Sequence, residues 1–408
     1  MSRFSTIRGS LRVGWPLFAL LPFAAPVQAQ TFNLAVVPNL DSANVSILDT
    51  SANVEVARIP TGPRPFYVAM SPDGQFAYVG EDGLGTPHMA VDRINLNTLV
   101  VEAQLTFNES SSMAELEISP DGRWLAVSEI QQGTTYIVDT QNWTVAHTVV
   151  LCPICDGETE ALFSPPNFSF SADSRTLYAG TNVNDLLTAV DLATGAVVET
   201  RPAQNSFGSP YSDIETGADG KVFLAHPDSS GTVRRFDMAG SGSSDLSLSQ
   251  TDISDFALIP RPGTTLLAAG SIVYDSNADY LSVLDLSTRK PKKIPSSESL
   301  RYLRYNPVRN ELWATCVGAF GFCAPFVIDV FDLNTLTRRA TIPGVSGASV
   351  VSRHPALSAN FQFYYQPLGS LDKILVIDAA TLAIVKQIPV GTNPRAVYIQ
   401  GDTAPHEK

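Results

Sequence analysis

The sequence predicts an all-β fold, an eight-bladed β-propeller. Two observations support this prediction: a repeated turn and the strand-like runs around it. The turn is Ser-Pro-Asp-Gly at Ser71 and again at Ser119. Further turns align with it at steps of 43 to 52 residues, at Ser171, Gly217, Pro260, Asn306 and His354. Each period holds four short β-rich runs, and four antiparallel strands in about 40 to 50 residues describe one blade of a propeller.

The runs within one period predict the order of its strands. An inner strand leads into the turn, and a second strand such as FAYVGE (76–81) or WLAVSE (124–129) leaves it. The third run ends in aspartate and a turn, as in TAVDLATG (188–195), and a fourth run such as VEVARIPT (54–61) follows. Alternating apolar residues, β-branched residues and Gly, Asn, Asp or Pro turns are typical of such strands.

The two ends of the chain predict how the ring closes. Residues 32–61 contain the last three strands of a blade without its first, and residues 395–400 (RAVYIQ) resemble a first strand alone. Joining the termini in one blade would remove the exposed strand edges. We therefore expect residues 395–400 beside residues 32–37. Seven blades is the alternative, if the strands at either end are misassigned.

The composition predicts an exported protein with a large core. The chain has 408 residues, of which 44% are apolar and 16% are charged. Residues 1–29 contain three arginines within the first twelve positions, continue with an apolar run and end in small residues. This pattern is typical of a secretory signal peptide. We expect one propeller domain at 30–402, a polar tail at 403–408 and a periplasmic or extracellular location. A retained membrane anchor is the alternative for residues 1–29, although prolines interrupt its short apolar run.

The charge excludes some partners. The formal net charge is −13, and removing residues 1–29 takes away three arginines and no acid. An acidic surface repels nucleic acid and anionic lipid. It suits a cation, a basic partner or simply solubility.

The stretch from Ala35 to Glu81 resembles the YVTN-type β-propeller repeat of exported bacterial proteins. The resemblance covers nearly all of the chain after residue 29 and weakens between Gly217 and Pro325. It implies the architecture and the compartment. Such repeats occur in surface-layer-like proteins, in non-catalytic subunits of periplasmic redox enzymes and in propellers similar to lactonases, so the resemblance leaves the function open.

The four cysteines are predicted to form two local disulfides. An even number of cysteines in an exported chain favours disulfide bonds. The predicted pairs are Cys152–Cys155 and Cys316–Cys323. Asp156 stands where a CxxCH heme-attachment motif needs histidine. A zinc site would have to join two blades on opposite sides of the ring, so we expect neither heme attachment nor zinc here.

Inner-strand residues are the main candidates for a ligand site. Strand side chains alternate, so positions two and four residues before the turn face the same way. The unusual residues at these positions are Glu115, Glu117, Asp213, Glu215, Tyr302 and Arg304. Buried carboxylates need a cation, protons or hydrogen-bond donors. Arg304 or a divalent cation such as calcium would supply this need. A water-filled channel is the alternative, and no cofactor is firmly implied.

A second acidic group is predicted at the rim of one face, which we call the loop face. The loops that enter the inner strands, and those that join second and third strands, form this face. Glu81 and Glu129 occupy equivalent positions in adjacent repeats, and Asp82 follows Glu81. Calcium binds such oxygen clusters, but the chain has no DxDxDG-type loop, so solvated acidic loops are the other interpretation.

The leading functional hypothesis is an exported, non-catalytic propeller that binds a protein partner or small ligand at its acidic loop face. The sequence contains no GxSxG elbow, phosphate-binding glycine loop or HExxH motif. One alternative is a metal-assisted hydrolase or lactonase-like enzyme that uses Glu115, Glu117, Asp213 or Glu215 as acid and base. Another is the scaffold subunit of a periplasmic dehydrogenase.

Overall fold

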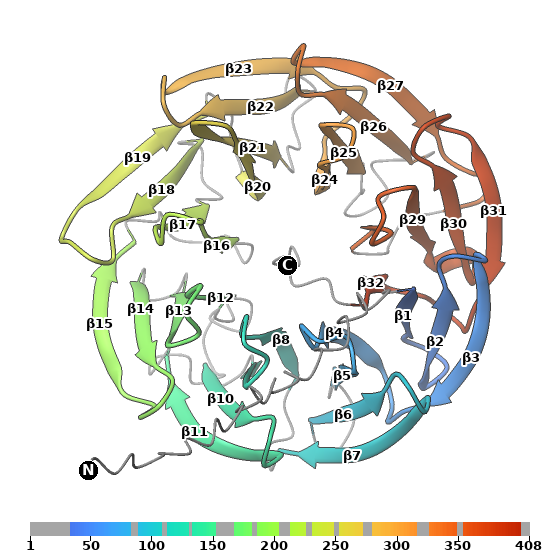
Figure 1. Cartoon of the computed structure of the whole chain (residues 1–408), viewed down its shortest axis with the longest axis horizontal. Helices are drawn as coiled ribbons and strands as arrows, with labels where there is room; N and C mark the ends of the chain where they lie inside the picture. Colours follow the sequence, from blue (N-terminus) through green and yellow to red (C-terminus); the bar gives the residue numbers. More distant parts are fainter. Residues whose placement is uncertain are drawn as a thin grey trace, which may run out of the picture. The chain divides into compact units, whose positions relative to one another are not determined.

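The chain forms a ring of eight blades, which confirms the predicted fold (Figure 1). The computed structural model describes residues 33–82, 89–107, 112–129, 133–151, 167–181, 186–203, 213–225, 231–248, 253–271, 280–315, 326–348 and 354–400. Every blade is one four-stranded antiparallel sheet. Blades 1 to 7 follow the chain from Pro65 onward, and blade 8 is the closing blade.

Each blade contributes one strand to each of four positions, counted from the axis outward. The inner strands are β4 (Pro65–Met70), β8 (Met113–Ile118), β12 (Asn167–Phe170), β16 (Ile214–Thr216), β20 (Ile253–Arg261), β24 (Arg301–Asn306), β28 (Ala356–Leu357) and β32 (Tyr398–Ile399). The second strands are β5 (Phe76–Glu81), β9 (Trp124–Glu129), β13 (Thr176–Thr181), β17 (Val222–Ala225), β21 (Thr264–Ser271), β25 (Glu311–Thr315), β29 (Phe363–Leu368) and β1 (Leu34–Asn39).

The outer half of each blade is a second hairpin. The third strands are β6 (Ala90–Asn95), β10 (Thr134–Asp139), β14 (Leu186–Asp191), β18 (Thr232–Phe236), β22 (Tyr280–Asp285), β26 (Val327–Asp332), β30 (Lys373–Asp378) and β2 (Asn44–Asp49). The outer strands are β7 (Val100–Thr106), β11 (Thr144–Val150), β15 (Val197–Pro202), β19 (Ser243–Ser247), β23 (Lys290–Pro295), β27 (Thr337–Pro343), β31 (Ile384–Pro389) and β3 (Val54–Pro60). The one helix in the described ranges is a 3-10 turn, Gly369–Leu371.

The closing blade joins the two ends of the chain, as predicted. β32 pairs with β1 through Tyr398 opposite Val36 and Ile399 opposite Ala35. The Gln400 side chain accepts the N–H of Leu34 at 3.2 Å and donates to the carbonyl of Gly74 at 2.6 Å. β32 also contacts β28 and β4, the inner strands on its two sides. The last strand therefore closes both its own sheet and the ring.

The repeated turn is stabilised by its serine. The Ser71 hydroxyl accepts the N–H of Phe76 at 2.8 Å and donates to Asp73 at 2.6 Å, and Gly74 adopts a φ of 66°. This positive φ explains the glycine. The third and seventh repeats form the equivalent two bonds without a glycine in the turn. The serine is Ser171 in the third repeat and Ser358 in the seventh.

Two of the aligned turns were therefore misplaced. In the seventh repeat the turn is Ser358-Ala-Asn-Phe, and His354 lies upstream of the inner strand. In the fifth repeat, Leu266 on the second strand is paired with Asp285 at the end of the third strand. Phe76 and Asn95 form the same pair in the first repeat, so Leu266 is the equivalent of Phe76. Ile259 is paired with Leu266, so Ile259 and not Pro260 matches the turn serine. Both errors arose because these turns lack the Ser-Pro-Asp-Gly letters.

The hydrophobic core is divided among the contacts between blades. Eight clusters of buried side chains lie in the described residues, and each joins two neighbouring blades. One cluster packs Val36 and Tyr398 of blade 8 against Val79 of blade 1. Another packs Val397 of blade 8 against Tyr365 of blade 7. Burial of apolar side chains against both neighbours therefore holds the closing blade in place.

Several predictions about the chain lie outside the described residues. These are the signal peptide at 1–29 and the tail at 403–408. Across the ranges that the structure describes, no helix has the length and apolar character needed to span a membrane.

Candidate functional site

The inner strands expose one row of backbone groups to the axis of the ring. Each inner strand is the last strand of its sheet, so one of its edges has no ladder partner. Unpaired N–H groups on such an edge must find water or side-chain acceptors, because leaving them buried without a partner is costly. The candidate residues lie along this edge.

The predicted carboxylates bond the next blade instead of forming one cluster. Three of the four are buried, and each accepts a backbone N–H from the following inner strand: Glu115 Oε2 from Phe168 (3.2 Å), Asp213 Oδ2 from Phe256 (3.2 Å) and Glu215 Oε2 from Leu258 (3.1 Å). Glu117 is half-buried at the matching position of blade 2. Glu115, Asp213 and Glu215 thus point toward the next blade and cap the edge of its inner strand.

Asp255 belongs to the same group, and the sequence analysis missed it. Its Oδ2 accepts the N–H groups of Tyr302 at 2.5 Å and Leu303 at 3.3 Å, and the side chain is 2% exposed. The alignment at Pro260 was displaced by one residue and pointed to Phe256. Small residues on the second strands, Gly80 and Gly270, lie opposite Tyr67 and Asp255. Aligning on these glycines would have found it.

Tyr302 and Arg304 lie at the predicted ring positions in blade 6. Tyr302 is buried, with a φ of 55° at a bulge in β24. Arg304 Nε donates to the carbonyl of Pro355 at 2.7 Å, and its Nη1 donates to the carbonyl of Leu303 at 2.9 Å. Arg304 thus donates to a backbone carbonyl of the next blade, whereas the carboxylates accept a backbone N–H of the next blade.

The corrected seventh turn brings His354 into the ring. His354 stands four residues before Ser358, the position that Tyr67 and Tyr302 occupy in their blades. Its ring lies 5.5 Å from Tyr302 and 6.1 Å from Tyr398, measured between centroids. His354 is 4% exposed. This aromatic group spans blades 6, 7 and 8.

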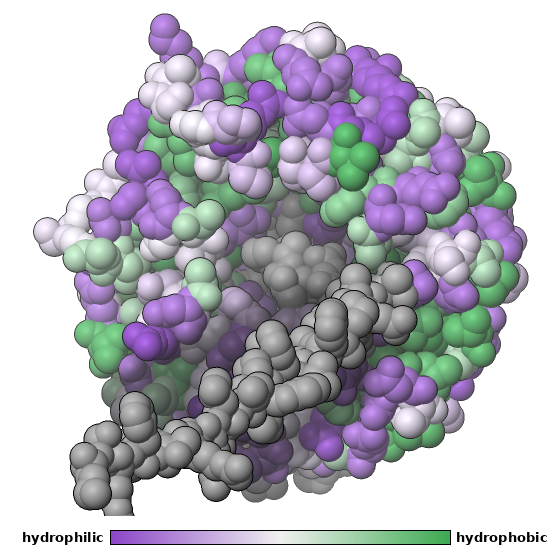
Figure 2. Space-filling model, in the orientation of Figure 1, coloured by the Kyte–Doolittle hydropathy of each residue, from purple (hydrophilic) through white to green (hydrophobic). Residues whose placement is uncertain are grey.

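The ring therefore has two unlike sectors. Blades 2, 4 and 5 carry the inner-strand carboxylates and blade 3 has Asn167 and Ser169 at these positions, whereas blades 6 to 8 and blade 1 carry aromatic rings and arginines. In the second sector, Arg301 lies over Tyr302 at 5.0 Å and Arg395 lies over Phe66 at 5.1 Å. Figure 2 shows that hydrophilic and hydrophobic residues are interspersed on the face seen in Figure 1. The two sectors can attract cationic and anionic groups of one ligand to different sides.

The predicted acidic rim differs from the structure in burial. Glu81 and Glu129 are 3% and 0% exposed, so neither is a solvated rim residue. Asp82 forms an ion pair with Arg64 at 2.8 Å. Burial, and next the charge of Asp92, raise the pKa of Glu81 to about 7. Glu81 therefore holds a proton over part of the neutral range.

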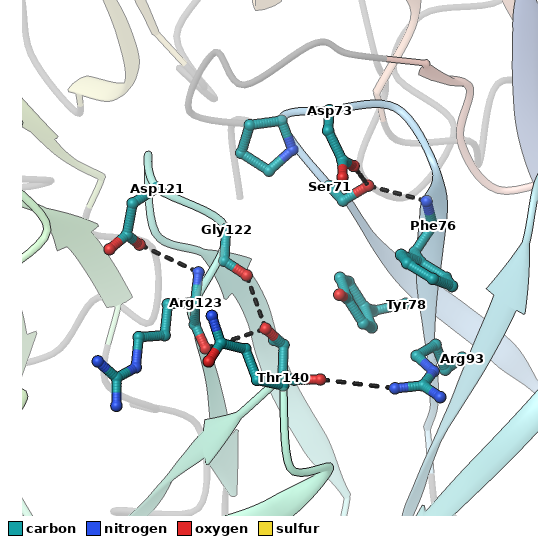
Figure 3. Close-up of a pocket in the computed structure, with 11 residues that line it drawn as sticks. Ser71, Asp73, Phe76, Tyr78, Arg93, Asp121, Gly122, Arg123 and Thr140 are labelled. Atoms are coloured by element: carbon teal, nitrogen blue, oxygen red, sulfur yellow. Dashed lines mark hydrogen bonds between the residues drawn. The ribbon is translucent and has the colours of Figure 1, made fainter.

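The opposite face has a pocket of about 470 Å³ between the tight turns of blades 1 and 2 (Figure 3). The Arg93 guanidinium lies against the rings of Phe76 and Trp143 at 5.3 and 5.2 Å. Thr140 Oγ1 donates to the carbonyl of Gly122 at 2.7 Å, and the Thr140 carbonyl accepts from Arg93 at 3.5 Å. The first bond lies within blade 2, and the second joins β6 of blade 1 to blade 2.

A family model for YNCE-like β-propellers matches residues 17–261, more than half of the chain. The protein belongs to the YNCE-like β-propeller family. The YVTN-type resemblance is thereby confirmed at the level of this propeller class.

This YNCE-like propeller is also similar to a curated protein and to solved structures. Dihydro-heme d1 dehydrogenase of Pseudomonas aeruginosa is 29% identical over 177 residues, which is 40% of this chain and 32% of that protein. The chain thus matches about a third of its relative's length. A structure of dihydro-heme d1 dehydrogenase NirN in complex with DHE has a TM-score of 0.74 at 19% identity, over 94% of this chain and 78% of that one. Apo AztD from Citrobacter koseri has a TM-score of 0.62 at 12% identity, over 90% and 97%. The structural likenesses show the fold.

Two predictions about metals and cysteines remain. Among the side chains that the structure describes, no three or more His, Cys, Asp or Glu residues form a metal-binding group. All four cysteines, Cys152, Cys155, Cys316 and Cys323, lie outside the described residues, so the two disulfides stay predictions.

Proposed function

We propose that this YNCE-like propeller is an exported, non-catalytic ligand-binding protein whose ligand binds at the loop-face end of the inner strands. The observation that carries the proposal is the aromatic group Tyr302, His354 and Tyr398, with Arg304 beside it. Aromatic faces and arginines recognise planar and anionic groups. The pattern of residues 1–29 supports export to the periplasm or beyond the cell.

The ligand class that fits this sector best is a planar molecule with carboxylate groups. The name of the curated relative supplies the first candidate, a heme d1-type tetrapyrrole. The three rings already pack on one another and are almost fully buried. Such a ligand would therefore lie across their edges at the loop face. Its carboxylates would face Arg304 or Arg395, on the side away from Glu115 and Asp213.

Absorbance titration with heme and with dihydro-heme d1 tests this proposal. We expect the wild-type protein to change the ligand spectrum saturably. His354→Ala should weaken binding at least tenfold, which corresponds to about 1.4 kcal/mol. His147→Ala is the matched control, because His147 lies on the outer strand β11. No spectral change with either ligand, or equal binding by wild type and His354→Ala, would contradict the tetrapyrrole assignment.

The alternatives predict different results. A metal-assisted hydrolase would need Glu115, Asp213 and Glu215 for chemistry, but each already accepts a backbone N–H. A scaffold subunit of a periplasmic dehydrogenase is favoured by the name of the curated relative. Such a scaffold would copurify with a separate redox subunit, whereas a ligand carrier would be isolated alone.

A further inference from the structure

Two buried carboxyl groups lie together in blade 1, on the face that packs against the closing blade. Glu81 ends β5 and Asp92 lies on β6, and they are 3% and 2% exposed. Gln104 on β7 bridges them, because its Nε2 donates to Glu81 Oε1 at 3.1 Å and to Asp92 Oδ1 at 2.9 Å. One neutral amide therefore serves both carboxyl groups.

No cation compensates this pair among the described residues. Neither Glu81 nor Asp92 takes part in an ion pair there. The charged groups on the surrounding elements pair with one another: Arg64 with Asp82 (2.8 Å), Arg58 with Glu55 (2.9 Å) and Arg93 with Glu102 (3.8 Å). Ionising both carboxyl groups would thus place two like charges in a buried site, which is costly.

Blade 6 has the equivalent of Asp92 in a different setting. Asp329 is paired with Thr341 across the outer hairpin as Asp92 is paired with Gln104. Its oxygens accept from Thr341 Oγ1 at 2.5 Å and from the Ser297 N–H at 2.7 Å. Arg338 adds an ion pair at 3.5 Å. Asp329 is therefore a buried carboxylate with enough donors and a cation.

The pair in blade 1 also holds the linker that crosses from blade 8. The Gly62 N–H donates to Asp92 Oδ2 at 3.3 Å. A Cβ atom at Gly62 would lie 1.8 Å from Glu81 Oε1, so the Glu81 carboxyl group rests directly on the linker backbone. Both carboxyl groups of the pair are therefore in contact with the backbone of this linker at Gly62.

We propose that Glu81 and Asp92 share one proton, and that losing this proton loosens the linker of residues 61–64 at the seam between blade 8 and blade 1. The seam is then a pH-sensitive element of the ring. It lies beside the loop face, because Glu81 is the last residue of β5. The proposal is independent of the ligand suggested above.

The direction of the pH effect follows because the folded state binds the proton more tightly than the unfolded state does. Burial raises the pKa of both groups, and that of Glu81 reaches about 7, against 4.5 for an ordinary glutamate. A raised pKa contributes stability at low pH, and this contribution is lost as pH rises from about 4.5 to about 7. The seam should therefore be closed at pH 5 and looser at pH 8.

Hydrogen exchange of the linker and infrared spectroscopy test the proposal. In wild type, we expect the opening equilibrium of residues 61–64 to rise on the order of a hundredfold between pH 5 and pH 8, since each unit of pKa shift corresponds to about tenfold. Glu81→Gln mimics the protonated acid and should make this equilibrium independent of pH. Asp329→Asn is the matched control and should retain the wild-type pH dependence.

The infrared spectrum gives a second readout, which reports the protonation state directly. The carbonyl band of a buried, protonated carboxylic acid should be present in wild type at pH 5 and disappear with a midpoint near the pKa of Glu81, about 7. Glu81→Gln should lack this band. Absence of the band in wild type at pH 5 would refute the shared proton. The same pH dependence of linker opening in wild type and Glu81→Gln would refute the coupling to the linker.

Discussion

Replacing Asp255 tests whether the inner-strand carboxylates stabilise the ring. Asp255→Ala would leave the N–H groups of Tyr302 and Leu303 without their carboxylate acceptor. Each buried N–H that loses its partner costs about 1–3 kcal/mol. Removing a buried charge returns part of this cost. We expect a net loss of about 3 kcal/mol in the free energy of unfolding.

Asp255→Asn separates the charge from the hydrogen bonds. The asparagine keeps one oxygen acceptor of the same size, so the expected loss is about 1 kcal/mol, the net value of a typical hydrogen bond. Glu298→Ala is the control, because Glu298 is an exposed carboxylate on the linker into β24. Its effect should stay within about 0.5 kcal/mol.

Urea unfolding measures the three variants against wild type, and hydrogen exchange at Tyr302 and Leu303 locates the change. The two amides should exchange faster in Asp255→Ala than in Asp255→Asn. If Asp255→Ala folds and is at least as stable as wild type, the carboxylate does not stabilise the ring. The carboxylate would then be a buried charge that costs as much as its bonds contribute.

Three further predictions concern closure, cysteines and cations. Deleting residues 394–408 removes β32 and should destabilise the whole ring in thermal melts, whereas deleting 403–408 should not; equal melting temperatures would contradict this role of β32. Mass mapping without reduction should find two local bridges, Cys152–Cys155 and Cys316–Cys323, each stabilising by about 2–3 kcal/mol, and cross-pairing would exclude them. If inner-strand carboxylates bind a cation, calcium, magnesium or manganese should raise the melting temperature. The free energy of unfolding should increase by about 2.7 kcal/mol at a hundredfold excess of the ion over its Kd. The double variant Glu117→Gln and Glu215→Gln should abolish that rise, and wild type unaffected by all three ions would rule the cation out.

The sequence by itself determined the blade count and the closure of the ring. Both rest on short-range rules: strands alternate every two residues, and the Ser71 turn needs only its own hydroxyl, Asp73 and Gly74. The sequence also pointed to Glu115, Asp213 and Glu215, because a charge at a position that is small or apolar elsewhere stands out in a repeat. These signals lie within one repeat.

The tertiary structure alone decided what these residues do. The N–H partner of Glu115 is 53 residues away, in another blade, and its position depends on how neighbouring sheets pack. Asp255 and His354 were missed because the fifth and seventh turns differ in sequence while keeping the same place in the sheet. The burial of Glu81 against Gly62 depends on the closing blade, which is built from both ends of the chain. Local pattern therefore sets the strands, whereas contacts between blades set the burial and partners of each carboxylate, because those contacts exist only in the closed ring.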